Sequence, residues 1–159
     1  MVEAMHEAHG IGLAAQQVGR ARQICVIDLR ETEADFSWKL DGASPPLELF
    51  MPMVVANPKL AVARKTPTAL SDEGCLSFPE IRGDVERAVA ISAVYQDQAG
   101  LPHTLECTGL FARCMLHEVD HINGILFIDR MAKEVREELK VALKALSRET
   151  RLGKDPTAA

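Results

Sequence analysis

The sequence predicts an α+β fold in which antiparallel strands wrap around one central, buried helix and an amphipathic helix ends the chain. The first observation behind this prediction is a proline-free run over residues 109–122 that closes on Asn123-Gly124, a pair typical of a helix end. The second is that short segments rich in β-branched residues precede this run. The third is length, because 159 residues suit a single domain, 1–159, with one core.

The first half of the chain combines regular segments with a loop. Residues 1–9 are typical of the end of a helix, and residues 22–29 predict a strand. Residues 31–52 contain three prolines and show little periodicity, so we expect a long surface loop. A strand bent at its Asn-Pro pair is expected over residues 54–63.

The second half supplies a hairpin and two helices. Residues 88–96 and 102–107 flank Asp-Gln-Ala-Gly, a sequence that favours a β-hairpin. The helix over residues 109–122 carries apolar residues on two adjacent stripes, which indicates burial on more than one side. Residues 125–130 predict a short extended link, and residues 132–151 a C-terminal helix with one apolar face.

Composition and charge exclude several classes of protein. Hydrophobic residues make up 47% of the chain and charged residues 26%, as in an ordinary soluble globular protein. No apolar run approaches the length of a membrane span, and the start lacks the features of a signal peptide, so we expect a cytoplasmic protein. A net charge of −5 argues against a protein that coats nucleic acid over its whole surface. The four cysteines show no framework spacing and are expected to be reduced thiols.

Two histidines four residues apart lie in the central helix. His117 and His121 fall on one stripe of the helix, and Glu118 falls on the neighbouring stripe. Two imidazoles one turn apart can bind one divalent ion, and a glutamate beside them can accept a proton from water on that ion. The alternative is a partly buried helix whose histidines have other partners, although every buried ring nitrogen needs one. The pattern favours a metal-binding helix.

A site with two histidines needs a third ligand, and Cys75 is the better candidate. It lies in a short, extended and mostly polar segment, DEGCLSFPEIRG. A thiolate is a strong ligand for zinc or iron. The alternative is a buried structural cysteine, which polar surroundings disfavour. The remaining histidines, His6, His9 and His103, show no paired spacing.

A stretch framed by glycines, HGIGLAAQQVG, covers residues 9–19. It is not a phosphate loop, because it lacks the Gly-Lys-Ser/Thr ending. Its glycines would let the backbone approach a ligand closely while the amide of Gln16 or Gln17 points into a site. A plain structural turn is the alternative.

Together, three stretches resemble the signature motifs of the peptide deformylases. They are GIGLAAQQVG, EGCLS and HEVDH, in that order, and the resemblance extends from about residue 3 to residue 132. GLFARCMLHEVDHINGILFIDR is similar to that family over its whole length. The resemblance implies a mononuclear, bacterial-type metallohydrolase that removes the formyl group from the N-terminal methionine of new polypeptides. It also implies Fe(II) as the physiological metal, replaceable by zinc, nickel or cobalt.

The resemblance assigns catalytic roles residue by residue. It implies Cys75, His117 and His121 as the metal ligands. Glu118 would be the general base that takes a proton from the bound water, so that metal-bound hydroxide attacks the formyl carbon. Glu118 would then return the proton to the leaving amine.

The same resemblance implies which groups meet the substrate. The side-chain amide of Gln17 and the backbone N–H of Leu76 would donate to the formyl oxygen as negative charge develops on it. The N-formyl-methionyl nascent peptide would be bound as an added strand, with its methionine in a pocket. The residues expected to bind it are Ile11, Gly12, Gly74, Arg82, Leu110 and Cys114.

The sequence departs from the family pattern at four places. Gln16 stands where the family usually has proline or threonine, and Ser71 stands where a residue near the methionine pocket is often apolar. The loop over residues 31–52 looks longer than usual, and the strand and helix that usually precede the first motif are missing. Apolar surface beside residues 2–13 would then lie open, so we expect a homodimer or a chain less stable than full-length relatives.

Two other functions stay open. A metallopeptidase would share His-Glu-x-x-His but usually takes a histidine or glutamate as its third ligand, where this chain offers Cys75. A catalytically silent module that binds formyl-peptides would keep the pocket and lose the chemistry. Retention of Glu118 and Gln17 disfavours that function.

A basic stripe is expected along the C-terminal helix, where four cations recur at intervals of four residues. One interpretation is a solvated face balanced by neighbouring glutamates. The other is a local nucleic-acid contact on an otherwise acidic protein, for which the partner would be ribosomal RNA near the exit tunnel. The four residues are Arg136, Lys140, Lys144 and Arg148.

Overall fold

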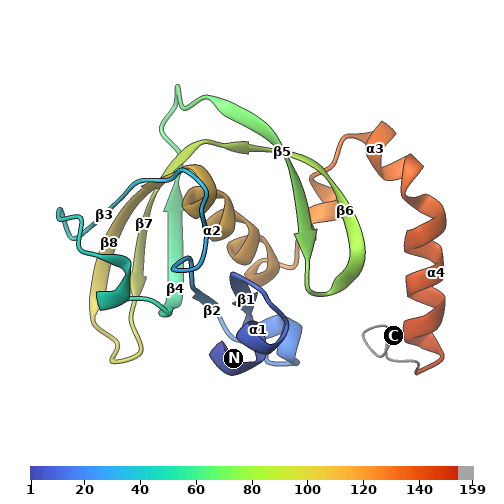
Figure 1. Cartoon of the computed structure of the whole chain (residues 1–159), viewed down its shortest axis with the longest axis horizontal. Coiled ribbons are helices and arrows are strands. Elements are labelled where there is room, and N and C mark those ends of the chain that lie inside the picture. The colour runs from blue at the N-terminus through green and yellow to red at the C-terminus, as the bar shows by residue number, and fades with distance from the viewer. Residues whose placement is uncertain (154–159) are drawn as a thin grey trace. The chain divides into compact units, whose positions relative to one another are not determined.

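A computed structural model describes residues 1–153, and these residues form two compact units (Figure 1). The first unit contains Met1–Ala69 and Arg87–Ile125, and the second contains Leu70–Glu86 together with the described residues from Leu126 onward. The single domain expected over residues 1–159 stays a prediction, and its residues 154–159 lie outside the described part. The α+β class is confirmed, because strands and helices are both present and the first unit's sheet is antiparallel.

The first unit is built on a six-stranded sheet with the order β1-β2-β4-β7-β8-β3. Its neighbouring strands all pair antiparallel. The predicted hairpin is confirmed, because β7 and β8 pair along their whole length. The predicted bend is confirmed as well, since Asn57 has a φ of 51° and the register of β4 against β7 shifts there. The strands are β1 (Gly12–Ala14), β2 (Ile24–Ile27), β3 (Trp38–Leu40), β4 (Met53–Ala61), β7 (Ala90–Gln96) and β8 (Pro102–Thr108).

Helix α2 (Gly109–Ile122) packs on this sheet and has the bounds that the sequence predicted (Figure 1). Strands β7 and β8 alternate buried and exposed residues, as strands with one face on a core do. Their buried side chains join those of α2 in one apolar cluster, so the strands surround the helix as expected. The unit also contains α1 (Val2–Glu7), η1 (Ala15–Val18) and η2 (Leu47–Leu49).

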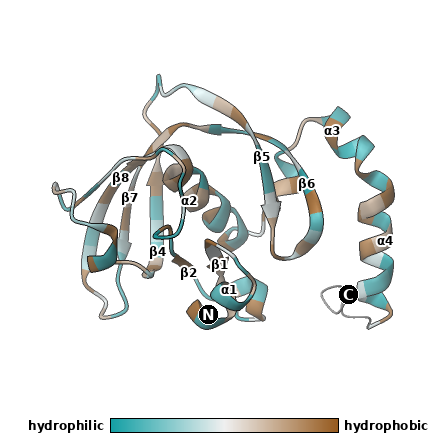
Figure 2. Cartoon of the chain, viewed as in Figure 1, coloured by the Kyte–Doolittle hydropathy of each residue, from teal (hydrophilic) through white to brown (hydrophobic). Residues whose placement is uncertain are grey.

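The second unit pairs β5 (Thr68–Cys75) with β6 (Phe78–Ala88) and adds a series of helices. Its core includes Val85 and Phe127, with partly buried leucines of the C-terminal helices packed against them. Gly83 lies so close to these helices that a Cβ there would stand 2.8 Å from Met131 Cε. Figure 2 shows hydrophobic and hydrophilic residues side by side along α4, as an amphipathic helix requires. The helices are η3 (Phe127–Asp129), α3 (Lys133–Glu138) and α4 (Lys140–Arg151).

The loop expected over residues 31–52 contains a strand that the sequence did not reveal. Strand β3 within it pairs with β8, which lies more than sixty residues later in the chain. A hydrogen bond also connects two parts of this segment, since Trp38 Nε1 donates to Pro45 O at 3.0 Å. A three-residue strand has too few positions to show a period of two, so its distant partner alone identifies it.

Two predictions near the C-terminus need correction. The extended link over residues 125–130 contains a 3₁₀ turn, in which Asp129 Oδ2 accepts a hydrogen bond from Leu126 N–H. The helix expected over residues 132–151 is interrupted at Leu139, whose side chain packs against the second unit's core. No helix among the described residues is long and apolar enough to cross a membrane.

Candidate metal and active site

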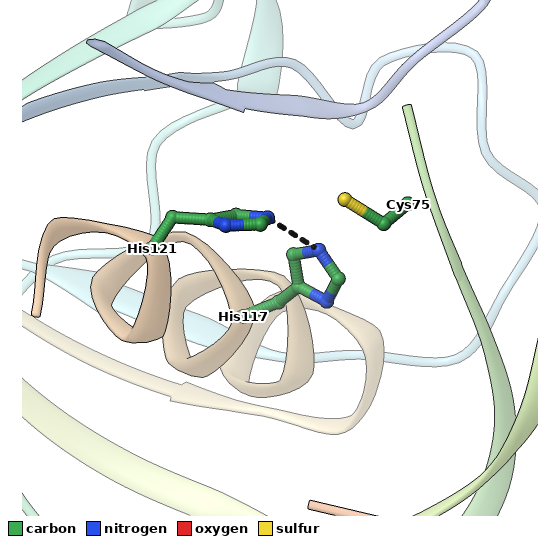
Figure 3. Close-up of side chains that lie close together, drawn as sticks. All are labelled: Cys75, His117 and His121. Atoms are coloured by element: carbon green, nitrogen blue, oxygen red, sulfur yellow. Dashed lines mark hydrogen bonds between the residues drawn. The ribbon is translucent and has the colours of Figure 1, made fainter. Parts of the chain in front are cut away.

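The two histidines of α2 point their ring nitrogens toward each other. His117 Nε2 and His121 Nε2 lie 3.2 Å apart (Figure 3), and the two rings meet edge to face. His121 is buried and His117 is half-buried. The geometry follows from a helix that advances one turn in about four residues, which stacks both side chains on one side.

Cys75 completes a group of three potential ligands. It is the last residue of β5, so its extended conformation agrees with the sequence prediction. Its sulfur and a ring nitrogen of each histidine all lie within 4.8 Å of one another, and Figure 3 shows the three side chains converging. The structure thus brings together the three residues that the motifs singled out.

Burial sets the protonation of the groups on α2. Desolvation first, and the charge of His117 second, lower the pKa of His121 to about 4. The ring is therefore neutral near pH 7, which is the form that binds metals. Burial raises the pKa of Glu118 to about 8, and the positive charge of Arg87 acts in the opposite direction. Within the described residues, Glu118 Oε2 is buried without a hydrogen-bond partner.

Strand β1 passes directly over the site-bearing face of α2. A Cβ built on Gly12 would overlap Glu118 Oε1 and would lie 2.9 Å from Cys114 Sγ. The Cys114 thiol also donates a weak hydrogen bond to Ile11 O at 3.7 Å. Gly12 is thus required for the close approach of β1 to α2, whereas the approach to a ligand that the sequence suggested stays a prediction. Leu110 packs half-buried against the same core.

The adjacent glutamines on η1 have different roles. Ala14 N–H donates to Gln17 Oε1 at 2.8 Å. Because a backbone N–H can only donate, this contact identifies the amide oxygen and directs the Gln17 amide nitrogen to the other side. Gln16 Nε2 instead donates to Arg22 O at 3.1 Å and to Ile122 O at 3.4 Å. Gln16 therefore ties η1 to the last turn of α2, a role that the sequence did not indicate.

The remaining predicted residues lie in the second unit. Leu76 is in the tight turn between β5 and β6, directly after Cys75. Arg82 is exposed and donates from its Nε to Asp72 Oδ2. Its guanidinium covers Gly74, where a Cβ would stand 2.7 Å from Arg82 Nη1.

One buried ion pair was missed. Arg87 Nη1 donates to Asp120 Oδ2 at 2.7 Å, and the two side chains are only 5% and 10% exposed. Two signals could have found it. Asp120 stands between the two histidines on α2, and Arg87 occupies an inward position of β6, in step with buried Ile81 and Val85.

Comparisons with known proteins give consistent results. The sequence model of a family described as polypeptide deformylase matches residues 1–137. A peptide deformylase of Opitutus terrae is 58% identical over 151 residues, which cover 95% of this chain and 79% of that protein. A peptide deformylase of Synechococcus sp. (strain RCC307) is 44% identical, and the match covers 85% of this chain but only 60% of that protein.

Solved structures agree with these relatives. The peptide deformylase of Thermus thermophilus superposes with a TM-score of 0.76 at 35% identity, over 95% of this chain and 80% of that one. The peptide deformylase of Synechococcus elongatus, solved in complex with actinonin, superposes with a TM-score of 0.73 at 39% identity, over 92% of this chain and 69% of that one.

Proposed function

This chain belongs to the polypeptide deformylase family, and we propose that it is the metal-dependent hydrolase that removes the formyl group from the N-terminal methionine of newly made polypeptides. The observation that carries the proposal is the convergence of Cys75, His117 and His121 within 4.8 Å, next to a buried glutamate on the same helix. One thiolate and two neutral imidazoles are donors that suit zinc or iron.

The surroundings of these donors fit a divalent ion. The buried Glu118 oxygen has no hydrogen-bond partner among the described residues, and a cation close by would offset its desolvation. The low pKa of His121 keeps its ring available as a ligand. We propose Fe(II) as the physiological metal, with zinc, nickel or cobalt able to replace it. A divalent ion held there would act as a Lewis acid and make water a nucleophile near neutral pH.

The chain's own groups would handle the proton and the developing charge. Glu118 would accept a proton from the attacking water and deliver it to the leaving amine, which is the work of one carboxylate acting first as base and then as acid. The amide nitrogen of Gln17, oriented by the Ala14 contact, would donate to the formyl oxygen. The backbone N–H of Leu76 would be the second donor, and losing such a donor lowers the rate by about 10²–10³-fold.

The substrate would be held as an added strand. Strand β1 is at the edge of its six-stranded sheet, and among residues 1–153 β5 forms a two-stranded sheet with β6. An edge strand presents N–H and C=O groups to an extended peptide. We assign this contact to the backbone of Ile11, Gly12 and Gly74. The side chains proposed around the peptide and its methionine are Leu110, Cys114 and Arg82.

Release of formate tests the proposal directly. Protein kept anaerobic with Fe(II) should release formate from formyl-Met-Ala-Ser and leave acetyl-Met-Ala-Ser intact. Binding of the formyl-peptide without formate, whatever the metal, would favour the silent binding module. Cleavage of internal peptide bonds would favour the metallopeptidase.

We also propose that the enzyme works in the cytoplasm at the ribosome, through the basic stripe on its C-terminal helices. Two of its four cations already have acidic partners, since Arg136 lies 3.3 Å from Asp129 and Lys140 lies 2.7 Å from Glu137. Both pairs are exposed and therefore weak, so an RNA phosphate could compete for either cation.

Ribosome binding should be salt-sensitive and should weaken when Lys140 and Lys144 are both changed to Glu, with formyl-peptide hydrolysis unchanged. If the wild type and the variant with both lysines changed to Glu bound ribosomes equally at low salt, the stripe would be only a solvated face. A homodimer remains our expectation for the oligomeric state, and sedimentation of the purified protein measures it.

A further inference from the structure

The buried ion pair between Arg87 and Asp120 supplies neither a metal ligand nor a proton in the chemistry proposed above, where Arg87 acts on Glu118 only through its charge. We infer that Arg87 is a positioning residue, which holds Asp120 and thereby fixes the C-terminal end of α2, whose last two turns carry both histidine ligands. The inference deepens the proposed function and rests on it only for the identity of those ligands. Both partners belong to the first unit, and their charged atoms lie 2.7 Å apart.

Stability alone is a poor explanation for this pair. Removing two charges from water is unfavourable, and the attraction between them often does no more than offset that loss. Apolar residues of similar volume would fill the same space without the desolvation penalty. A charged pair that is nevertheless buried on a functional helix points to a requirement for one defined geometry.

The position of Asp120 gives it control over both histidines. It directly precedes His121 and follows His117 by three residues, so its side chain lies about 60° around the helix axis from that of His117. Glu118 lies about 100° from His117 in the other direction. Arg87 therefore holds the helix on the flank opposite the catalytic carboxylate.

The backbone of the same turn is fixed as well. Asp120 O accepts hydrogen bonds from Asn123 N at 2.9 Å and from Ile125 N at 2.8 Å. Ile122 O accepts from Gln16 Nε2 at 3.4 Å. With Arg87 on the Asp120 carboxylate, both the main chain and the side chain of this turn are held. A cation here also complements the negative end of the helix dipole.

A small rotation of this part of α2 would disturb the positions of the metal ligands. A ring nitrogen about 6 Å from the helix axis moves by roughly 1 Å when the helix turns by about 10°. Metal–ligand distances are defined to within about 0.2 Å, so such a movement would spoil the ligand set. Groups that orient metal ligands typically change metal affinity by about 10–100-fold when they are removed.

Three variants test the inference. Arg87→Met removes the charge and keeps the length, Arg87→Lys keeps a charge without the planar fork, and Arg87→Met with Asp120→Leu replaces the pair by apolar side chains. Arg64→Met, an exposed arginine of the same unit, is the control. The measurements are Zn²⁺ affinity by chelator competition, the visible spectrum with Co²⁺, and the melting temperature of the metal-free protein.

We expect Arg87→Met to weaken Zn²⁺ binding by about 10–100-fold and to change the Co²⁺ spectrum, with Arg87→Lys in between. The double variant should recover the melting temperature and keep the weakened Zn²⁺ binding. If the double variant recovered both the melting temperature and the Zn²⁺ affinity, the pair would have only a structural role and the inference would be overturned. Wild-type Zn²⁺ affinity in Arg87→Met and Arg87→Lys would overturn it as well. None of these measurements needs turnover, so a wild-type protein that released no formate would refute the proposed function alone.

Discussion

Replacing Gly12 by alanine should separate the geometry of the site from the stability of the fold. The new methyl group would lie 2.9 Å from Cys114 Sγ and would overlap Glu118 Oε1. Ordinary van der Waals contact begins at 3.4 Å. Either β1 or the Glu118 side chain must therefore move by about 0.5 Å or more, because core packing leaves no space to absorb a methyl group.

The magnitude follows from the function of Glu118. Displacing a catalytic group by about 1 Å lowers a rate by about 10²-fold, so we expect kcat/KM for formyl-Met-Ala-Ser to fall by one to two orders of magnitude, or about 1.4–2.7 kcal/mol of transition-state stabilisation. Overpacking should also destabilise the fold by about 1–3 kcal/mol.

Gly100→Ala is the matched control. Gly100 has a φ of +81°, so alanine is strained there, yet no atom lies within 4 Å of the position of the added Cβ. This variant should lose about 1 kcal/mol of stability and keep its kcat/KM. If Gly12→Ala kept wild-type kcat/KM while its melting temperature fell, the contact between β1 and Glu118 would be irrelevant to catalysis.

Two further predictions concern the metal ligands and acid stability. Cys75→Ala should lose stoichiometric metal, whereas Glu118→Gln should keep the metal and lose turnover. Metal analysis of both variants separates the two roles, and Cys107→Ala is the control that should retain metal. Loss of metal in Glu118→Gln alone would reverse the assignment. Hydrogen bonds, first of all from the Arg30 side chain, lower the pKa of Asp28 from 3.8 to about 2. The ionised Asp28 carboxylate should contribute about 1–2 kcal/mol to folding after screening. This contribution should be complete above about pH 4 and disappear as the pH falls through 2. In urea titrations, Asp28→Asn should therefore lose less stability over that pH range than the wild type.

Local sequence was sufficient for the bounds of α2 and for the relative positions of its candidate site residues. A helix repeats every 3.6 residues, so the spacing of His117, Glu118 and His121 already placed them on adjacent stripes, and Asn123-Gly124 marked the end of the helix. The hairpin formed by β7 and β8 was equally visible, because its turn and both strands are contiguous in the chain. The motifs that contain these residues also identified the family.

Tertiary structure decided what depends on residues distant in sequence. Strand β3 exists because β8 pairs with it, and three residues alone carry no readable period. Gly12 must be glycine because the packing of β1 on α2 brings Cys114 and Glu118 against its Cα. The sequence places Asp120 between two histidines and Arg87 in step with Ile81 and Val85, but it does not show that Arg87 and Asp120 meet. Only the fold buries them side by side, because pairing between residues distant in sequence leaves no local signal. The desolvation of either charge is tolerable only when the other charge lies next to it.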